Sequence, residues 1–203
     1  MDDSQIYLKA MKNALELVKD RKYTYDTKYD NVNEEEVKYL LGINNLFIIG
    51  KNDVENKKII VKMININKVK SINIKEIYSE IKNELQESNE TLEIILVLKN
   101  KPTSIIKKLE KEKDFNNLQI MYIKQFMFNP TKHKLVPKHT KISIEEEDAI
   151  LKEYALSSKN QLPIILKDDP IVRYYNFKAG DILKINSSVG TMNTNYIYYR
   201  CVR

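Results

Sequence analysis

The chain of 203 residues can bury a core as one large domain or two small ones, so it needs neither a disulfide nor a metal to fold. Its single cysteine, Cys201, excludes an internal disulfide and is typical of a reducing compartment. The net charge of +6, from 34 basic and 28 acidic residues, fits a lysine-rich surface or a weak attraction to nucleic acid. No apolar run is long enough for a membrane span, and the start M-D-D-S-Q is unlike a signal peptide, so we expect an intracellular protein.

The N-terminal stretch predicts two helices separated by an irregular segment. Spacings of three and four predict a helix over Gln5–Lys19, whose apolar stripe comprises Leu8, Met11, Leu15 and Val18. Tyr23–Asn31 breaks this pattern and is expected to be a loop whose tyrosines either stack on bases or anchor the loop in the core. Asn33 and Glu36 form a variant capping box for a short helix that Gly42 ends.

Apolar runs after this helix predict a small mixed sheet. Leu46–Ile49 and Ile59–Ile64 form a hairpin around the polar loop Gly50–Lys58, and Leu92–Leu98 and Leu118–Ile123 are buried strands. A helix opened by Asn73-x-x-Glu76 precedes the third strand. A helix starting at Pro102 joins the last two strands, which a right-handed crossover makes parallel. Residues 1–130 are therefore predicted to form an α/β domain, followed by a linker over residues 131–134 and a second domain over 131–203.

The second domain carries a dense set of turn and cap signals. Ser143-x-x-Glu146 is a capping box for a helix with Ala149, Ile150 and Tyr154 on its inner face. Asp169-Pro170 starts another helix, as N-cap and first helical residue, and Asn176 suits a left-handed exit. Gly180-Asp181 is a turn into the strand Asp181–Ile185, whose partner is Tyr196–Val202. This pattern indicates a small α+β docking module.

The residue types and their spacing give little support for a catalytic site. His133 and His139 share no helix face, and His139 is expected to fix the local turn by a hydrogen bond, while Cys201 packs in a strand. A metal-dependent nuclease would need an acid-x-Lys triplet where Ile60-Val61-Lys62 stands, and Asp53 and Glu55 in the preceding loop lack a partner. We expect no catalytic residue, metal, cofactor or small-molecule substrate.

An ordered, collinear set of residues in the last seventy resembles a known family. The set comprises Leu135-Val136-Pro137-Lys138-His139, Ser143, Glu145-Glu146-Glu147, Gln161-Leu162-Pro163, Asp169-Pro170, Arg173-Tyr174-Tyr175, Gly180-Asp181, Lys184-Ile185 and Tyr199-Arg200. It is similar to the C-terminal assembly domain of the fifth-largest subunit shared by eukaryotic RNA polymerases I, II and III, and to the archaeal RNA polymerase subunit that is its counterpart. The N-terminal half resembles the family more weakly.

The resemblance implies a non-catalytic subunit of a DNA-dependent RNA polymerase. Its C-terminal domain would anchor to the largest subunit, among other polymerase subunits, and its N-terminal domain would be a jaw-like part near downstream double-stranded DNA. The implied assembly residues are Pro137, His139, Gln161, Pro163, Asp169, Pro170, Arg173, Tyr174, Tyr175, Gly180, Tyr199 and Arg200. The implied DNA-proximal residues are Lys99, Lys101, Pro102, Thr103 and Ser104, a loop that would contact phosphates without reading sequence.

This chain departs from the family pattern at three places. Ile164 stands where a basic residue is usual, Asn176 where a glycine is usual, and Asn186–Gly190 replaces an Arg-Pro-Ser-x-Thr-Ala-Gly-like run. These changes indicate an altered partner surface and a divergent polymerase, nuclear in a eukaryotic cell, or in the host cytoplasm or virion if viral. A free-standing regulator that binds a polymerase transiently stays open as the alternative.

Overall fold

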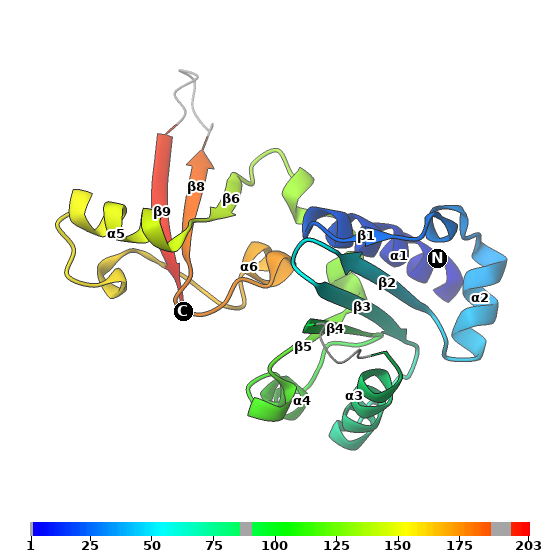
Figure 1. Ribbon diagram of the computed structural model, residues 1–203. Helices are drawn as coiled ribbons and strands as arrows, with labels where there is room; N and C mark the ends of the chain where they lie inside the picture. The colour runs from blue at the N-terminus through cyan, green and yellow to red at the C-terminus, as the bar shows by residue number, and fades with distance from the viewer. Residues whose placement is uncertain (1, 86–90, 188–195) are drawn as a thin grey trace. The chain divides into compact units, whose positions relative to one another are not determined.

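The computed structural model describes residues 2–85, 91–187 and 196–203, and the chain divides into two compact units (Figure 1). Unit 1 is Met1–Phe128 and unit 2 is Asn129–Arg203. The segment predicted as a linker, residues 131–134, overlaps the short 3-10 helix η4 (Pro130–Lys132), which lies against helix α6 (Pro170–Tyr175). The start of this segment therefore packs within unit 2.

Unit 1 is a five-stranded mixed sheet in the order β1-β2-β3-β4-β5. Its first two pairings are antiparallel and its last two are parallel. The strands are β1 (Thr24–Tyr25), β2 (Phe47–Asn52), β3 (Lys57–Ile64), β4 (Thr91–Leu98) and β5 (Leu118–Tyr122). The helices are α1 (Asp3–Asp20), α2 (Glu34–Gly42), α3 (Ser71–Leu85) and α4 (Ser104–Leu109), with short 3-10 helices η1 (Thr27–Asn31), η2 (Lys113–Phe115) and η3 (Ile123–Phe126).

Helices cover both faces of this sheet, which explains its unbroken apolar strands. Figure 1 shows α1 on one side and α3 and α4 on the other. Even-numbered residues of β4, such as Ile94 and Leu96, pack with α3 and α4, and the odd-numbered Ile95 and Val97 are buried from the opposite face. Each fully buried Ile or Leu side chain contributes about 1.5–3 kcal/mol, so this doubly covered strand is a major source of stability.

The predicted hairpin and crossover are confirmed. β2 and β3 are antiparallel, β4 and β5 are parallel, and the strands of the hairpin extend further than predicted, so that its loop shortens to residues 53–56. Asn52 holds this loop because its Oδ1 accepts the backbone N–H groups of Val54 and Glu55, both at 3.1 Å. Gly50 allows a close approach: a Cβ there would lie 2.8 Å from Cγ1 of Val18 in α1.

Several local predictions for unit 1 were wrong. The segment around Tyr25 is no plain loop, since it forms the edge strand β1 and the 3-10 helix η1. Met11, Leu15 and Val18 of the predicted stripe on α1 are buried, but Leu8 is only half-buried, because the buried face also takes in Tyr7 and Ala14. Asn73 lies inside α3, where its side chain accepts the Lys70 N–H at 3.1 Å.

Helix α2 ends at the predicted residue, and a left-handed residue follows two positions later. Asn33 and Glu36 form the predicted capping box, and Gly42 is the last residue of α2. The left-handed residue that redirects the chain is Asn44, at φ 52°.

Unit 2 is a four-stranded mixed sheet in the order β6-β8-β9-β7. β8 pairs antiparallel with both neighbours, and β7 pairs parallel with β9. The strands are β6 (Lys138–Lys141), β7 (Ile164–Ile165), β8 (Ile182–Ser187) and β9 (Tyr196–Val202). The helices are α5 (Ile144–Glu153), α6 and the 3-10 helices η4 and η5 (Lys159–Gln161).

One helix packs on each face of this second sheet. Ile150 of α5 joins Ile182 and Cys201 in one cluster, and Val172 of α6 joins Leu183 in the other. The predicted packing role of Cys201 is confirmed, since its side chain is buried. The predicted inner face of α5 was wrong in two of three residues: only Ile150 is buried, because the helix ends at Glu153 and leaves Tyr154 51% exposed.

Candidate assembly surface

Helix α6 begins as the sequence predicts, and this start fixes where its aromatic residues lie. Asp169 is the N-cap, and its Oδ1 accepts the backbone N–H groups of Ile171 at 2.8 Å and Val172 at 3.4 Å. Pro170 occupies the first helical position, where its missing N–H has no intrahelical partner to lose. These two residues therefore fix where the helix starts, and Pro170 is exposed while Asp169 is half-buried.

The exit of α6 gathers three aromatic rings. Asn176 ends the helix in the predicted left-handed conformation, at φ 56° and ψ 37°. Tyr174 is buried, and the half-buried Tyr175 contacts its ring edge-on at a centroid distance of 5.2 Å. Tyr175 also stacks on Phe177 at 5.3 Å, and the half-buried Arg173 lies on the same short helix. Half-buried aromatic and arginine residues are typical anchors of protein interfaces.

The residues around Pro163 make up a second group. The Gln161 side chain accepts the Ser157 and Ser158 N–H groups at 2.7 and 3.2 Å, so it closes the turn η5. The Pro163 carbonyl accepts the Cys201 N–H at 2.9 Å. The Arg200 guanidinium donates to the Ile164 carbonyl at 3.0 Å, which ties the end of β9 to this segment.

Tyr199 and Gly180 complete the predicted assembly residues of the sheet. Tyr199 is half-buried and meets Tyr154 edge-on at 6.0 Å. Burial, then the neighbouring Tyr154, raise the pKa of the Tyr199 hydroxyl above its ordinary value. Gly180 turns the chain into β8 at φ 88°, which a residue with a side chain would adopt only under strain.

His139 and Pro137 lie at the opposite edge of the sheet, next to β6. His139 Nδ1 donates to the Pro137 carbonyl at 2.8 Å, which confirms the predicted turn-fixing hydrogen bond. Because the strand order is β6-β8-β9-β7, this pair is separated from Tyr199 by β8. The twelve predicted residues thus fall into three groups, one at α6, one around Pro163 and β9, and one at β6.

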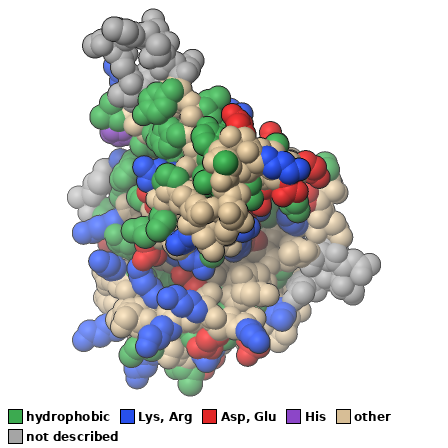
Figure 2. Space-filling model, turned by 90° about the vertical axis from the view of Figure 1, so that its left-hand side faces the viewer, with side chains coloured by type: hydrophobic (Ala, Val, Ile, Leu, Met, Phe, Trp, Pro, Cys, Tyr) green, Lys and Arg blue, Asp and Glu red, His purple; other side chains and the backbone are tan. Residues whose placement is uncertain are grey.

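Exposed apolar residues form a feature of unit 2 that the sequence analysis missed. Figure 2 shows hydrophobic side chains gathered on the surface beside the grey residues in the upper part of the view. Tyr196 and Ile197 of β9 are 56% and 48% exposed, and Ile164 is 45% exposed. The available signal was the run Tyr-Ile-Tyr-Tyr at 196–199, which places large apolar side chains on both faces of a strand. Of the departing loop Asn186–Gly190, residues 188–190 lie outside the described residues.

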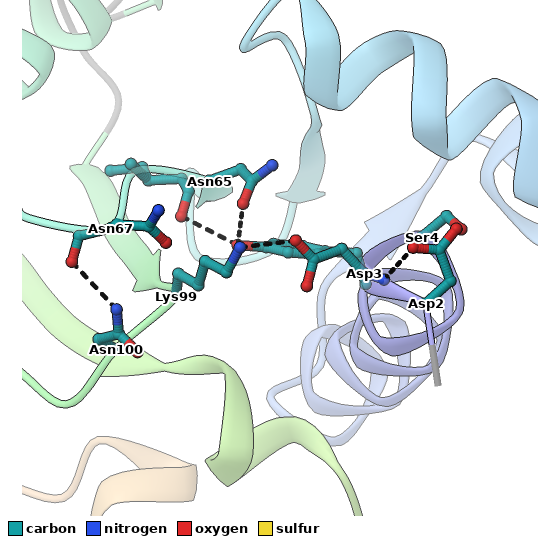
Figure 3. A network of polar contacts seen from close by, with 9 residues as sticks. Asp2, Asp3, Ser4, Asn65, Asn67, Lys99 and Asn100 are labelled. Atoms are coloured by element: carbon teal, nitrogen blue, oxygen red, sulfur yellow. Dashed lines mark hydrogen bonds and ion pairs between the residues drawn. The ribbon is translucent and has the colours of Figure 1, made fainter.

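The loop predicted to face DNA is only partly available for a phosphate. Lys99 Nζ forms an ion pair with Asp3 Oδ2 at 2.6 Å, as Figure 3 shows. Lys101 is exposed, and Pro102 is buried. The predicted helix starts later than expected, since Thr103 is the N-cap of α4 and Ser104 its first residue. With six residues, α4 is a short helix with a correspondingly weak dipole.

A buried ion pair on the sheet of unit 1 was not predicted. Arg21 donates from Nη1 to Glu93 on β4 and from Nη2 to Gln119 on β5, the latter at 2.9 Å. The Tyr23 hydroxyl donates to the other Glu93 oxygen at 3.1 Å. The arginine charge and two donors already engage this carboxylate, so it is a structural acid and offers no open metal site.

The nuclease frame has no acid set of its own in the structure. Ile60 and Val61 are buried apolar residues of β3, and Glu55 in the hairpin loop pairs with Lys57. Over residues 2–85, 91–187 and 196–203, no three His, Cys, Asp or Glu side chains are grouped to hold a metal ion. Among these residues, no helix is long and apolar enough to cross a membrane.

Comparison with known proteins matches both units. A sequence profile for "RNA polymerase Rpb5, C-terminal domain" matches residues 128–202. The Arabidopsis thaliana DNA-directed RNA polymerase V subunit 5A is 30% identical over 212 residues, which cover 99% of this chain and 90% of that protein. The Dictyostelium discoideum DNA-directed RNA polymerases I, II, and III subunit rpabc1 is 28% identical over 207 residues, which cover 100% of both chains.

An archaeal relative matches a shorter stretch more closely. DNA-directed RNA polymerase subunit Rpo5 of Sulfurisphaera tokodaii is 42% identical over 74 residues, which are 36% of this chain and 86% of that protein. The higher identity over this length, the profile match to unit 2 and the full-length similarity to the plant protein agree. The chain therefore belongs to the Rpb5 family of RNA polymerase subunits.

Proposed function

We propose that this chain is a non-catalytic subunit of a DNA-dependent RNA polymerase, anchored to the largest subunit by unit 2. One observation carries the proposal. The archaeal relative is named as a polymerase subunit, and its match to this chain spans 74 residues, which are 86% of that relative. This length is close to that of unit 2. A module of this size therefore suffices in a polymerase subunit, and it is the part of this chain that we expect to bind other subunits.

The residues of unit 2 support an anchoring role. Arg173 and Tyr175 are half-buried on α6, Tyr199 is half-buried on β9, and Ile164 of β7 and Ile197 of β9 are exposed apolar side chains. An interface core of aromatic and arginine anchors with apolar neighbours fits this composition. Ile164, in place of the basic residue usual in the family, would meet a partner surface that is less acidic there.

Unit 1 is proposed to be the jaw-like part near downstream DNA. Lys101 is exposed beside the start of α4, and Lys99 would reach a phosphate only by exchanging its ion pair with Asp3. An exposed pair of this kind is worth about 0–1 kcal/mol, so the exchange costs little. Contacts of this loop would be independent of sequence and would weaken as salt increases.

Stoichiometry tests the proposed function. A tagged copy expressed in its native host should elute from gel filtration with the large catalytic subunits and in equal amount to them. A free-standing regulator would appear in lower amount and would dissociate on dilution. If most of the chain elutes as a 23.9 kDa monomer, the subunit proposal is wrong.

A further inference from the structure

One stretch of β9 is a sheet edge. All of β8 pairs with β9, over residues Tyr196 to Cys201 of β9, whereas β7 pairs only with Cys201 and Val202. Figure 1 shows β6, β8 and β9 side by side with β9 outermost in its upper half. Residues 196–200 of β9 thus have a strand neighbour on one side alone within the described chain.

The hydrogen-bond partners of neighbouring residues show which backbone N–H and C=O groups of β9 face outward from this edge. The Val202 N–H donates to Asp181 on the β8 side, and the Cys201 N–H donates to Pro163 on the other side, both at 2.9 Å. Because successive residues of a strand alternate, the N–H and C=O groups of Tyr199 and Ile197 point the same way as those of Cys201. In the described part of the chain, neither residue has a backbone partner on that side.

Pro163 is the reason that pairing stops at Cys201. In a parallel ladder, the residue whose carbonyl accepts the Cys201 N–H would donate its own N–H to the Tyr199 carbonyl. Proline has no N–H, so this bond cannot form and the β7 ladder ends. The proline therefore leaves an open edge directly beyond the last paired residue.

The other sheet edges of the described chain are blunted. On the outer side of β5, the Ile120 N–H donates to the Glu110 carboxylate and the Tyr122 N–H donates to Gln125 Oε1 at 3.0 Å. β1 and β7 have two residues each, and β6 carries Lys138 and Lys141, which discourage pairing. Between Tyr196 and Tyr199 the edge of β9 carries no charged residue, and its Tyr196 and Ile197 side chains are exposed.

The side chains along this edge specify the occupant. Tyr196 and Tyr198 stack at a centroid distance of 5.5 Å, and the Arg200 guanidinium lies 5.7 Å from the Tyr198 ring centre. On the opposite face, Lys184 is the register partner of Tyr199. Neither β8 nor β9 contains an acidic residue. Two copies pairing edge to edge would bring like charges together, so an acidic partner fits better.

We infer that the open edge of β9 at Ile197 and Tyr199 accepts an extended segment of another polymerase subunit as an added strand. This segment is mainly apolar and carries at least one acidic residue, which faces Arg200 or Lys184. Addition of a strand supplies main-chain hydrogen bonds to Ile197 and Tyr199, and the alternating side chains of the segment contact the exposed tyrosine and isoleucine. The inference rests on the proposed function and names the mode of attachment.

Amide hydrogen exchange, resolved to single residues, tests this directly in the full chain, free and in purified polymerase. The Ile197 and Tyr199 amides should exchange at least about tenfold more slowly in the polymerase than in the free chain. The Tyr198 and Arg200 amides, which face β8, are the control and should be slow in both. Equal exchange at Ile197 and Tyr199 in the two samples overturns the strand addition while the chain remains a subunit. Failure to co-purify with the polymerase overturns the proposed function as well.

Substitution of Ile197 gives a second, independent readout. Ile197→Pro removes one outward N–H and leaves the hydrogen bonds to β8 in place, whereas the control Ile197→Thr keeps this N–H. In competition with the wild-type chain, Ile197→Pro should be recovered in purified polymerase about tenfold less than Ile197→Thr. Equal recovery of the two variants overturns the inference. A thermal melt of each variant checks that both fold alike, and the exchange experiment needs no variant.

Discussion

The Arg21–Glu93 pair allows a quantitative prediction for unit 1. The side chains of Arg21 and Glu93 are only 4% and 17% exposed, so neither charge can be rehydrated without opening the sheet. Glu93→Gln keeps the size of the side chain and an oxygen for the Tyr23 hydroxyl, but it removes the charge that neutralises Arg21. Breaking a buried pair in this way costs about 3–5 kcal/mol. Because Gln119 still accepts from Arg21 at 2.9 Å, we expect about 3 kcal/mol.

Urea unfolding and a thermal melt of the full chain measure this loss. A loss of about 3 kcal/mol should lower the melting temperature of unit 1 by about 10 °C. The matched control is Glu55→Gln, whose pair with Lys57 is 49% and 43% exposed and should change stability by less than about 0.5 kcal/mol. The double variant Arg21→Met, Glu93→Gln removes both charges and should recover much of the loss. If Glu93→Gln is no less stable than Glu55→Gln, or if the double variant is the least stable, Arg21 and Glu93 do not stabilise unit 1 as a buried charge pair.

Three further predictions concern assembly, DNA and pH. Arg173→Ala should reduce incorporation into polymerase. Tyr175→Ala should do the same and also destabilise the free chain by about 2 kcal/mol, since it loses contacts with Tyr174 and Phe177. An unchanged melt of the Tyr175→Ala chain would contradict this. Lys99→Ala with Lys101→Ala should leave incorporation intact and lower DNA retention at low salt only. Asp3→Asn, which releases Lys99, should raise DNA retention at low salt. DNA retention that does not change with salt concentration would contradict a phosphate contact. Burial, then the Glu93 charge, raise the pKa of Tyr23 above its ordinary 10.0, so its contribution to stability is fully present below pH 10 and is lost as pH rises above it. Urea unfolding at about pH 9 and about pH 11 should therefore show a smaller decline for Tyr23→Phe than for the wild-type chain.

Local signals in the sequence predicted much of the fold because they act over a few residues. The caps at Asn33, Ser143 and Asp169 depend on a side chain reaching an N–H two or three positions ahead, and all three are present. The left-handed exit at Asn176 and the buried run of β4 follow from equally local rules.

Contacts between distant residues were beyond sequence reasoning. The Arg21–Glu93 pair joins residues 72 positions apart, and the Lys99–Asp3 pair joins residues 96 apart, so no spacing reveals them. The edge strand β1 was missed because two residues carry no periodicity, and it forms only where β2 passes beside it. The assembly residues were predicted as one set, but the strand order places them in three groups.

Two left-handed residues of this chain lower its folding stability. Among the residues that the structure describes, five other than glycine have positive φ, and three of them are asparagines, which tolerate this conformation. Lys22 at φ 65° and Ala155 at φ 51° have no such tolerance, and each is strained by about 1–2 kcal/mol. Glycine at either position would remove this strain, although it would also loosen the unfolded chain. The chain has only four glycines, so strained residues stand at two of its turns and lower its melting temperature. These two positions are the first to substitute in engineering a more stable variant.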